Sequence, residues 1–230
     1  MPNTSFRKRI LALAAVAAVV IVAVFAWAPS NRAQEPLPII PVTSPQVKSG
    51  GTEVVSSTAV LGDVVIGNPD AKVTVVEYAS FTCPHCARFH QNSWDKLKAD
   101  YIDAGKVRFM LREVYFDRFG LWASMVARCG GASAFYPLAE QFMKQQNTWA
   151  HAPQEQIGAE IQKIGRMNGL TAGQLSGCLS DQGYANALIK AYQDNATADE
   201  ITSTPTFLVN GEKLSGNKPD ELFALIDGQL

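Results

Sequence analysis

The fold is decided by one stretch of the chain, Val73-Thr-Val-Val-Glu-Tyr-Ala-Ser-Phe-Thr-Cys-Pro-His-Cys86. Its first half, residues 73–79, is rich in β-branched and aromatic residues, which is typical of a buried strand. Residues from Cys86 to about Tyr101 are predicted to be helical, and residues 107–114 alternate apolar and polar side chains like a second strand. A strand, a helix and a strand in this order predict two parallel strands with a right-handed crossover.

Two cysteines open the predicted helix. Cys83 and Cys86 are three residues apart, so their side chains lie on one face, within the reach of a disulfide. At a helix N-terminus, free N–H groups and the positive end of the helix dipole stabilise an anion. We therefore expect Cys83 to be a thiolate with a lowered pKa and Cys86 to be the buried resolving thiol. Pro84 suits the first helical turn, and His85 can place a cation or a donor beside the Cys83 sulfur.

Half of a structural zinc site is the alternative reading of this cysteine pair. Zinc needs two further ligands at a suitable spacing, whereas Cys129 and Cys178 are single cysteines and His90 is one isolated imidazole. We therefore expect no metal ion. His90 lies seven residues after Cys83, and we expect it to be packed or exposed rather than catalytic.

Glu77 lies in the middle of the first strand, six residues before Cys83. A carboxylate buried at this point could pass a proton to or from Cys86. The neighbours of Glu77 on the same face of the strand, Val75 and Ala79, are both apolar, which favours this functional role. The alternative is a glutamate at the edge of the strand that faces water.

The rest of the domain adds a helical block and a hairpin. Residues 118–200 are predicted to be an all-helical insertion, in which Thr171 and Gln174 have the spacing of a capping box. Asn210-Gly211 between two apolar runs predicts a β-hairpin, and residues 218–230 are predicted to form the last helix. The fold class is therefore α/β, with a large helical insertion between the β-α-β unit and a β-β-α end.

The first 60 residues are predicted to precede the folded domain, which spans 60–230. Residues 1–9 form a basic, cytoplasmic region with Arg7-Lys8-Arg9, and residues 10–28 carry no charge. A helix of that length is about 28 Å long, enough to cross a membrane, so it is either a signal anchor or a signal peptide with an Ala26-Trp27-Ala28 cleavage site. Both alternatives export the rest of the chain. Residues 29–59, with five prolines, form a linker.

Composition excludes several classes of protein. The chain has 230 residues and a net charge of −1, which gives no general attraction to nucleic acid. A hydrophobic content of 47% is ordinary for a globular protein and high for a disordered one.

In an exported chain, Cys129 and Cys178 are expected to form a disulfide. Two buried free thiols, or a regulatory redox pair, are the alternatives.

Two stretches resemble a known family. Residues 75–86, which end in Cys-Pro-His-Cys, are similar to the active-site stretch of DsbA-type thiol:disulfide oxidoreductases of the thioredoxin superfamily. The stretch Thr204-Pro205-Thr-Phe-Leu-Val-Asn-Gly211 resembles the cis-proline strand of that superfamily. The resemblance covers about residues 60–230 and implies a DsbA-like thioredoxin fold. It also implies that Pro205 is cis and faces the sulfur of Cys83.

The resemblance carries further residue roles. An acidic residue at the place of Glu77 and a second, structural disulfide like Cys129–Cys178 both occur among DsbA-like proteins. Thr204 departs from the DsbA pattern, which usually has Val before the proline. Threonine is common there in isomerases and reductases, so its hydroxyl could interact with the sulfurs and shift the reduction potential.

The implied function is oxidation of reduced, cysteine-containing exported polypeptides in the periplasm through a Cys83–Cys86 disulfide. The family implies a DsbB-like, quinone-coupled membrane oxidase as the partner that restores the disulfide, and it needs no diffusible cofactor. A protein disulfide isomerase or reductase of the same compartment is the first alternative. A non-catalytic thioredoxin-like binding protein is the second, and the intact Cys-Pro-His-Cys motif argues against it.

Overall fold

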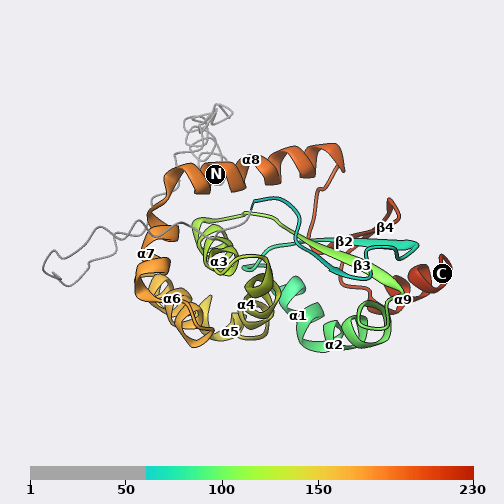
Figure 1. The fold of residues 1–230 in the computed structure, drawn as a ribbon, viewed down its shortest axis with the longest axis horizontal. Coiled ribbons are helices and arrows are strands. Elements are labelled where there is room, and N and C mark those ends of the chain that lie inside the picture. Colours follow the sequence, from blue (N-terminus) through green and yellow to red (C-terminus); the bar gives the residue numbers. More distant parts are fainter. Residues whose placement is uncertain (1–60) are drawn as a thin grey trace, which may run out of the picture. The chain divides into compact units, whose positions relative to one another are not determined.

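The computed structural model describes residues 61–230. They form a mixed sheet with helices on both of its faces (Figure 1). The strand order in the sheet is β1-β3-β2-β4-β5. The strands are β1 (Val65–Gly67), β2 (Val73–Ala79), β3 (Val107–Glu113), β4 (Thr206–Val209) and β5 (Glu212–Ser215).

The centre of the sheet is the predicted parallel pair. Strands β2 and β3 pair in parallel, from Val73 opposite Val107 to Ala79 opposite Glu113, which confirms the predicted β-α-β unit. Strand β1 is an addition that the sequence analysis missed. It pairs antiparallel with β3 and is only three residues long, too short to show an alternating pattern.

The predicted hairpin is also confirmed. Strands β4 and β5 pair antiparallel around Asn210 and Gly211, whose φ angles of 48° and 89° are those of a type I′ turn. The side-chain oxygen of Asn210 accepts a hydrogen bond of 2.8 Å from the N–H of Thr74, which fastens the turn to β2. Helix α9 (Pro219–Asp227) follows the hairpin.

The helix after Cys83 is shorter than predicted. A continuous helix over residues 86–101 was expected, but the backbone departs from helical geometry at Ser93, where φ is −131°. The chain therefore forms three consecutive segments, α1 (Pro84–Asn92), α2 (Trp94–Leu97) and the π-helical turn η1 (Lys98–Ile102). The helical spacing of apolar residues continues through Ser93, so the sequence does not reveal the bend.

The helical insertion expected at about 118–200 is confirmed. It comprises α3 (Arg118–Cys129), α4 (Ala132–Lys144), α5 (Gln146–Trp149), α6 (Ile157–Met167), α7 (Ala172–Ser180) and α8 (Gln182–Ala198). Thr171 and Gln174 form the predicted capping box at the start of α7. The hydroxyl of Thr171 accepts from the N–H of Gln174, and the side chain of Gln174 accepts from the N–H of Thr171.

The two faces of β2 point into different apolar clusters. Val73, Val75 and Ala79 belong to the main core, which also contains side chains of α1, α3 and α4. Val76 and Tyr78 point the other way, into a smaller cluster against which Tyr192 of α8 packs. Helix α8 accordingly lies on the side of the sheet opposite α1 and α2 (Figure 1). Glu77 alternates with the first set and so faces the main core.

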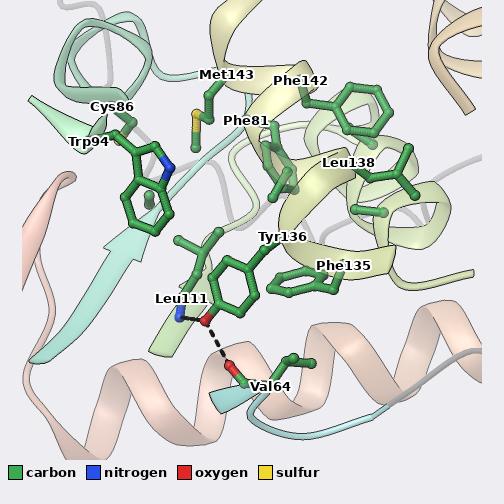
Figure 2. Packing of buried hydrophobic residues seen from close by; sticks show 14 of the residues in the cluster. Val64, Phe81, Cys86, Trp94, Leu111, Phe135, Tyr136, Leu138, Phe142 and Met143 are labelled. Carbon is green, nitrogen blue, oxygen red and sulfur yellow. Dashed lines mark hydrogen bonds between the residues drawn. The ribbon is translucent and has the colours of Figure 1, made fainter. Parts of the chain in front are cut away.

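A buried tyrosine ties the insertion to the sheet (Figure 2). The hydroxyl of Tyr136 in α4 accepts a hydrogen bond of 3.1 Å from the N–H of Leu111 in β3. It donates one of 2.7 Å to the carbonyl oxygen of Val64, which precedes β1. The helical insertion is therefore joined to the sheet by polar contacts as well as by apolar packing.

The predictions for residues 1–60 lie outside the described part of the chain. They concern the basic region 1–9, the membrane segment 10–28 and most of the linker 29–59. Between residues 61 and 230, no helix has both the length and the apolar character needed to span a membrane.

Candidate active site

The structure places the cysteine pair where β2 passes into α1. Cys83 is the N-cap residue, with extended backbone angles, and Pro84 is the first residue of the helix. The N–H of Cys83 donates to the carbonyl oxygen of Ser80 at 3.1 Å, which closes a tight turn after the strand. Both cysteines are free thiols here, and the exposed fraction is 7% for Cys83 and 0% for Cys86. Of the two residues, only Cys83 has any surface open to a second molecule.

The surroundings of Cys83 favour its thiolate. A hydrogen bond from the Cys86 thiol is the main cause that lowers the pKa of Cys83 to about 5. Partial burial opposes the shift, whereas the Thr204 hydroxyl and the N–H groups of Cys86 and His85 add to it. The lowered pKa agrees with the expectation from the helix N-terminus. The hydrogen bond from Cys86 was not part of that expectation.

Cys86 has the opposite character. Complete burial is the main cause that raises the pKa of its thiol far above the ordinary value, and the hydrogen bond to Cys83 and the charges of Cys83 and Glu77 add to the rise. A thiolate at Cys86 is unfavourable in free energy, so this sulfur needs a proton when the disulfide is broken. The two sulfurs are therefore adapted to different tasks, Cys83 as the leaving group or nucleophile and Cys86 as the thiol that stays protonated.

The loop before β4 supplies the opposite wall of the site. The Thr204–Pro205 peptide bond is cis, as the family resemblance implied. The Cys83 thiol lies 3.6 Å from the carbonyl oxygen of Thr204. Pro205 is buried, whereas Thr204 is partly exposed. Thr204 therefore contacts the reactive sulfur through its hydroxyl and through its backbone.

His85 lies on the surface of the active site. Its side chain is exposed, and what reaches the Cys83 sulfur from this residue is its backbone N–H at the helix N-terminus. The imidazole is not among the groups that lower the pKa of Cys83. His85 is the second residue of α1, and the contribution from this residue to the lowered pKa of Cys83 comes from its main chain, so a role for the imidazole stays a prediction.

Glu77 is buried, with an exposed fraction of 0%, so the alternative of a water-facing glutamate is wrong. Its carboxylate contacts Nε2 of His90 at 3.0 and 3.2 Å. His90 is itself 2% exposed. The sequence predicts His90 to be packed or exposed, and it does not reveal this contact with Glu77. The four-residue spacing between Cys86 and His90, which puts both on one side of a helix, was the available signal.

Gln146 is a second residue that the sequence analysis missed. Its side-chain amide, from α5, donates hydrogen bonds of 2.8 Å to the carbonyl oxygen of Phe81 and 2.9 Å to that of Cys83. Gln146 is 1% exposed, so these bonds are shielded from water. On the other side of the same turn, the hydroxyl of Thr82 donates to Asp117 at 2.7 Å. The loop that carries Cys83 is thus held by Gln146 of α5 and by Asp117, the N-cap residue of α3.

Cys129 and Cys178 form a disulfide, with a Cα–Cα distance of 6.0 Å. The bond joins the end of α3 to α7, so it closes the helical insertion on itself. The alternative of two buried free thiols is wrong. Among residues 61–230, no group of three His, Cys, Asp or Glu side chains is placed to hold a metal ion.

The fold and the dithiol define a class, that of thioredoxin-like proteins with a Cys-x-x-Cys pair at a helix N-terminus and a helical insertion. The sequence profile of the thioredoxin family matches residues 59–228. The chain belongs to this family and, within the superfamily, to its DsbA-like members.

Similar proteins agree with this assignment. A protein of Rickettsia bellii, provisionally named a protein-disulfide oxidoreductase, is 35% identical over 166 residues. That match covers 72% of this chain and 63% of the relative, so the chain spans less than two thirds of its length.

Solved structures share the fold. Alpha-DsbA1 of Wolbachia pipientis has a TM-score of 0.67 at 24% identity, over 76% of this chain and 96% of its own. BdbD of Bacillus subtilis has a TM-score of 0.65 at 23% identity, over 73% and 92%.

Proposed function

We propose that this protein is a thiol:disulfide oxidoreductase that donates the Cys83–Cys86 disulfide to reduced, cysteine-containing polypeptides. The observation that carries the proposal is the contrast between the two sulfurs, one accessible with a pKa of about 5 and one fully buried with a raised pKa. The family membership and the name of the Rickettsia bellii relative support it.

The reaction would proceed in two exchanges. A substrate thiolate attacks the Cys83 sulfur, a new disulfide forms between substrate and Cys83, and the electron pair of the old bond leaves on Cys86. A second substrate thiolate then attacks the substrate sulfur of the mixed disulfide and releases Cys83 as a thiolate. The substrate is oxidised by two electrons and the cysteine pair is reduced by two. The lowered pKa of Cys83 makes it a good leaving group in the second exchange.

The same contrast favours oxidation over reduction. Stabilisation of the Cys83 thiolate stabilises the reduced protein relative to its disulfide, which makes the disulfide a stronger oxidant. Thr204 was noted as a residue common in isomerases and reductases. Its hydroxyl here lowers the pKa of Cys83, which acts in the oxidising direction.

The compartment and partners extend the proposal. A protein that oxidises thiols works where disulfides persist, so we place residues 29–230 in the periplasm. Residues 10–28 would tether it to the inner membrane, or would be removed as a signal peptide after export. Its reduced pair would be reoxidised by a DsbB-like, quinone-coupled membrane oxidase. Its substrates would be exported polypeptides with free cysteines.

The reduction potential of the Cys83–Cys86 pair tests the direction of the reaction. The protein is equilibrated with glutathione buffers and the fractions of dithiol and disulfide are counted by alkylation and mass spectrometry. A potential above about −200 mV is expected for an oxidase, whereas a value near about −270 mV would identify a reductase or isomerase. A variant with Cys129 and Cys178 replaced by serine separates the two pairs. Full thiol oxidation by Cys83→Ala would show that the protein is not an oxidoreductase through this pair.

A further inference from the structure

The buried side chain that the proposed reaction leaves unexplained is His90. It lies one helical turn after Cys86 in α1, with its Nε2 atom 3.0 Å from the Glu77 carboxylate. Its other ring nitrogen, Nδ1, is buried and has no hydrogen-bond partner among the described residues. The polar contact of the ring is therefore directed at Glu77. An imidazole buried in an apolar core for packing alone would lower the stability of the fold, because each buried polar atom without a hydrogen-bond partner costs free energy.

The surroundings of the pair leave few other proton carriers. Trp94 of α2 stacks on the His90 ring, with ring centroids 5.0 Å apart. In the sheet, Glu77 is flanked by the apolar Leu111 of β3 and Phe207 of β4. The charge of Glu77 raises the pKa of Cys86 in α1 and of Tyr136 in α4. Of these two, only Cys86 changes its covalent state in the proposed reaction.

We propose that His90 is a positioning residue of the redox reaction, which holds Glu77 beside Cys86 and shares with it the proton that Cys86 takes up. This inference rests on the proposed function. When the substrate thiolate attacks Cys83, Cys86 leaves with the electron pair of the broken disulfide. The proton shared by Glu77 and His90 passes to the Cys86 sulfur, and the pair is left with one proton fewer. It is recharged from water, so that charge and protons balance over the cycle.

A pair of Glu77 and His90 is better suited to protonate Cys86 than Glu77 alone. A lone buried carboxylate beside a leaving thiolate places two negative charges in an apolar core, which is unfavourable. The neighbouring imidazole can hold a proton at Nε2, 3.0 Å from the carboxylate, and pass it on. The reverse step uses the same contacts, because the Cys86 thiol must return a proton before it attacks a mixed disulfide.

The test is the pH dependence of single-turnover disulfide transfer. The oxidised full chain is mixed with a reduced dithiol peptide between pH 5 and 9, and loss of the Cys83–Cys86 disulfide is followed by acid quench and alkylation. We expect His90→Gln, which keeps a hydrogen-bond donor but cannot carry the proton, to be about tenfold slower at pH 7 and to have a changed pH profile. Glu77→Gln should behave alike, and the double variant should be no slower than the slower single variant.

Trp94→Phe is the matched control, because it disturbs packing on the His90 ring without removing an ionisable group. It should lower stability and leave the pH profile as in the wild type. An unchanged profile in His90→Gln, or the same change in Trp94→Phe, would overturn the role of His90. In either case the proposed function stands if the wild type transfers its disulfide, and it fails if the wild type does not.

A second measurement does not depend on any variant. The protein is labelled with 15N-histidine, and the ring nitrogens of His90 are observed by NMR in the disulfide and dithiol states across the same pH range. We expect the protonation of the His90 ring to differ between the two states, because Cys86 holds a proton only in the dithiol. Identical titration in both states would contradict the proposal even if His90→Gln fails to fold.

Discussion

The sulfur of Cys83 lies 3.6 Å from the carbonyl oxygen of Thr204, although 121 residues separate the two in the sequence. This contact joins the helix that carries the reactive thiol to the loop that carries the cis proline. A substrate sulfur bonded to Cys83 would therefore lie close to Thr204. The residue before the proline is thus a neighbour of the bond that is made and broken.

Replacement of Thr204 by valine should raise the pKa of Cys83. The Cys86 thiol makes the main contribution to the lowered pKa, and the Thr204 hydroxyl adds to it. Loss of that hydroxyl should raise the pKa by about one unit and make the disulfide less oxidising. Thiolate absorbance at 240 nm against pH measures the shift. Thr202→Val, in the same loop but exposed, should leave the pKa unchanged.

The stability of the reduced protein should depend on pH through Cys83. The pKa of this thiol is lowered from 9.0 to about 5 in the folded state, so the unfolded chain binds the proton more tightly. The stabilisation is complete above about pH 9 and is lost as the pH falls through 5. Cys86, whose pKa is raised from 9.0 in the folded state, stays protonated in both states below about pH 8 and contributes little slope there.

We expect the reduced protein to lose about 2 kcal/mol of its free energy of unfolding between pH 8 and pH 5, after allowance for the partial solvent screening of the site. Urea unfolding at both values measures it. Subtracting the same difference for Cys83→Ser removes the contribution of all other groups. Equal differences in the two proteins would contradict the lowered pKa.

Substitution of Cys86 by alanine should trap the reaction halfway. The buried thiol can no longer attack the bond between substrate and Cys83, so the mixed disulfide lasts longer. Incubation with an oxidised model peptide and non-reducing mass spectrometry should detect the adduct on Cys83. The same change removes the main group that lowers the pKa of Cys83, so that pKa should rise. Cys83→Ala should form no adduct.

The Cys129–Cys178 disulfide should stabilise the fold without setting the redox chemistry. It closes 49 residues, for which chain entropy gives up to about 4 kcal/mol. Replacement of both cysteines by serine should lower the free energy of unfolding by an amount of this order, measured by urea titration. The reduction potential of the Cys83–Cys86 pair should stay unchanged. A shifted potential would instead favour a regulatory role for this second pair.

Gln146→Ala should weaken the active-site turn. It leaves the buried carbonyl oxygens of Phe81 and Cys83 without their side-chain donor, which costs about 1–3 kcal/mol of stability. Gln145→Ala is the matched control, since the side-chain amide of Gln145 donates to the side chain of Gln141 one turn away and makes no contact with the active-site turn among the described residues. Urea unfolding should separate the two variants. Similar stabilities would show that the two hydrogen bonds of Gln146 contribute nothing.

The sequence predicts local structure better than the contacts between distant segments. The parallel pair β2–β3, the hairpin at Asn210-Gly211 and the capping box at Thr171 are encoded by neighbouring residues, and all three are confirmed. The position of Cys83 at the helix N-terminus follows from the same local signals. The bend at Ser93 was missed because apolar spacing continues through it.

The sequence does not predict which side chains from distant elements contact the residues of the active site. Glu77 was noticed as a polar residue in an apolar strand, but its partner His90 lies in another element, 13 residues away. Gln146 is one of many polar residues in a helical block, and only packing of α5 against the turn after β2 gives it a role.

Two of the hydrogen bonds that hold the reactive turn come from Gln146, a residue of the helical insertion. The insertion is therefore part of the redox centre and not an addition to a self-sufficient thioredoxin domain. A chain trimmed to the sheet, α1 and α9 would keep Cys-Pro-His-Cys and the cis proline, but the carbonyl oxygens of Phe81 and Cys83 would lose the side-chain donor that Gln146 provides. An insertion exchanged for that of another thioredoxin-like protein would therefore have to bring its own side-chain donor for this turn.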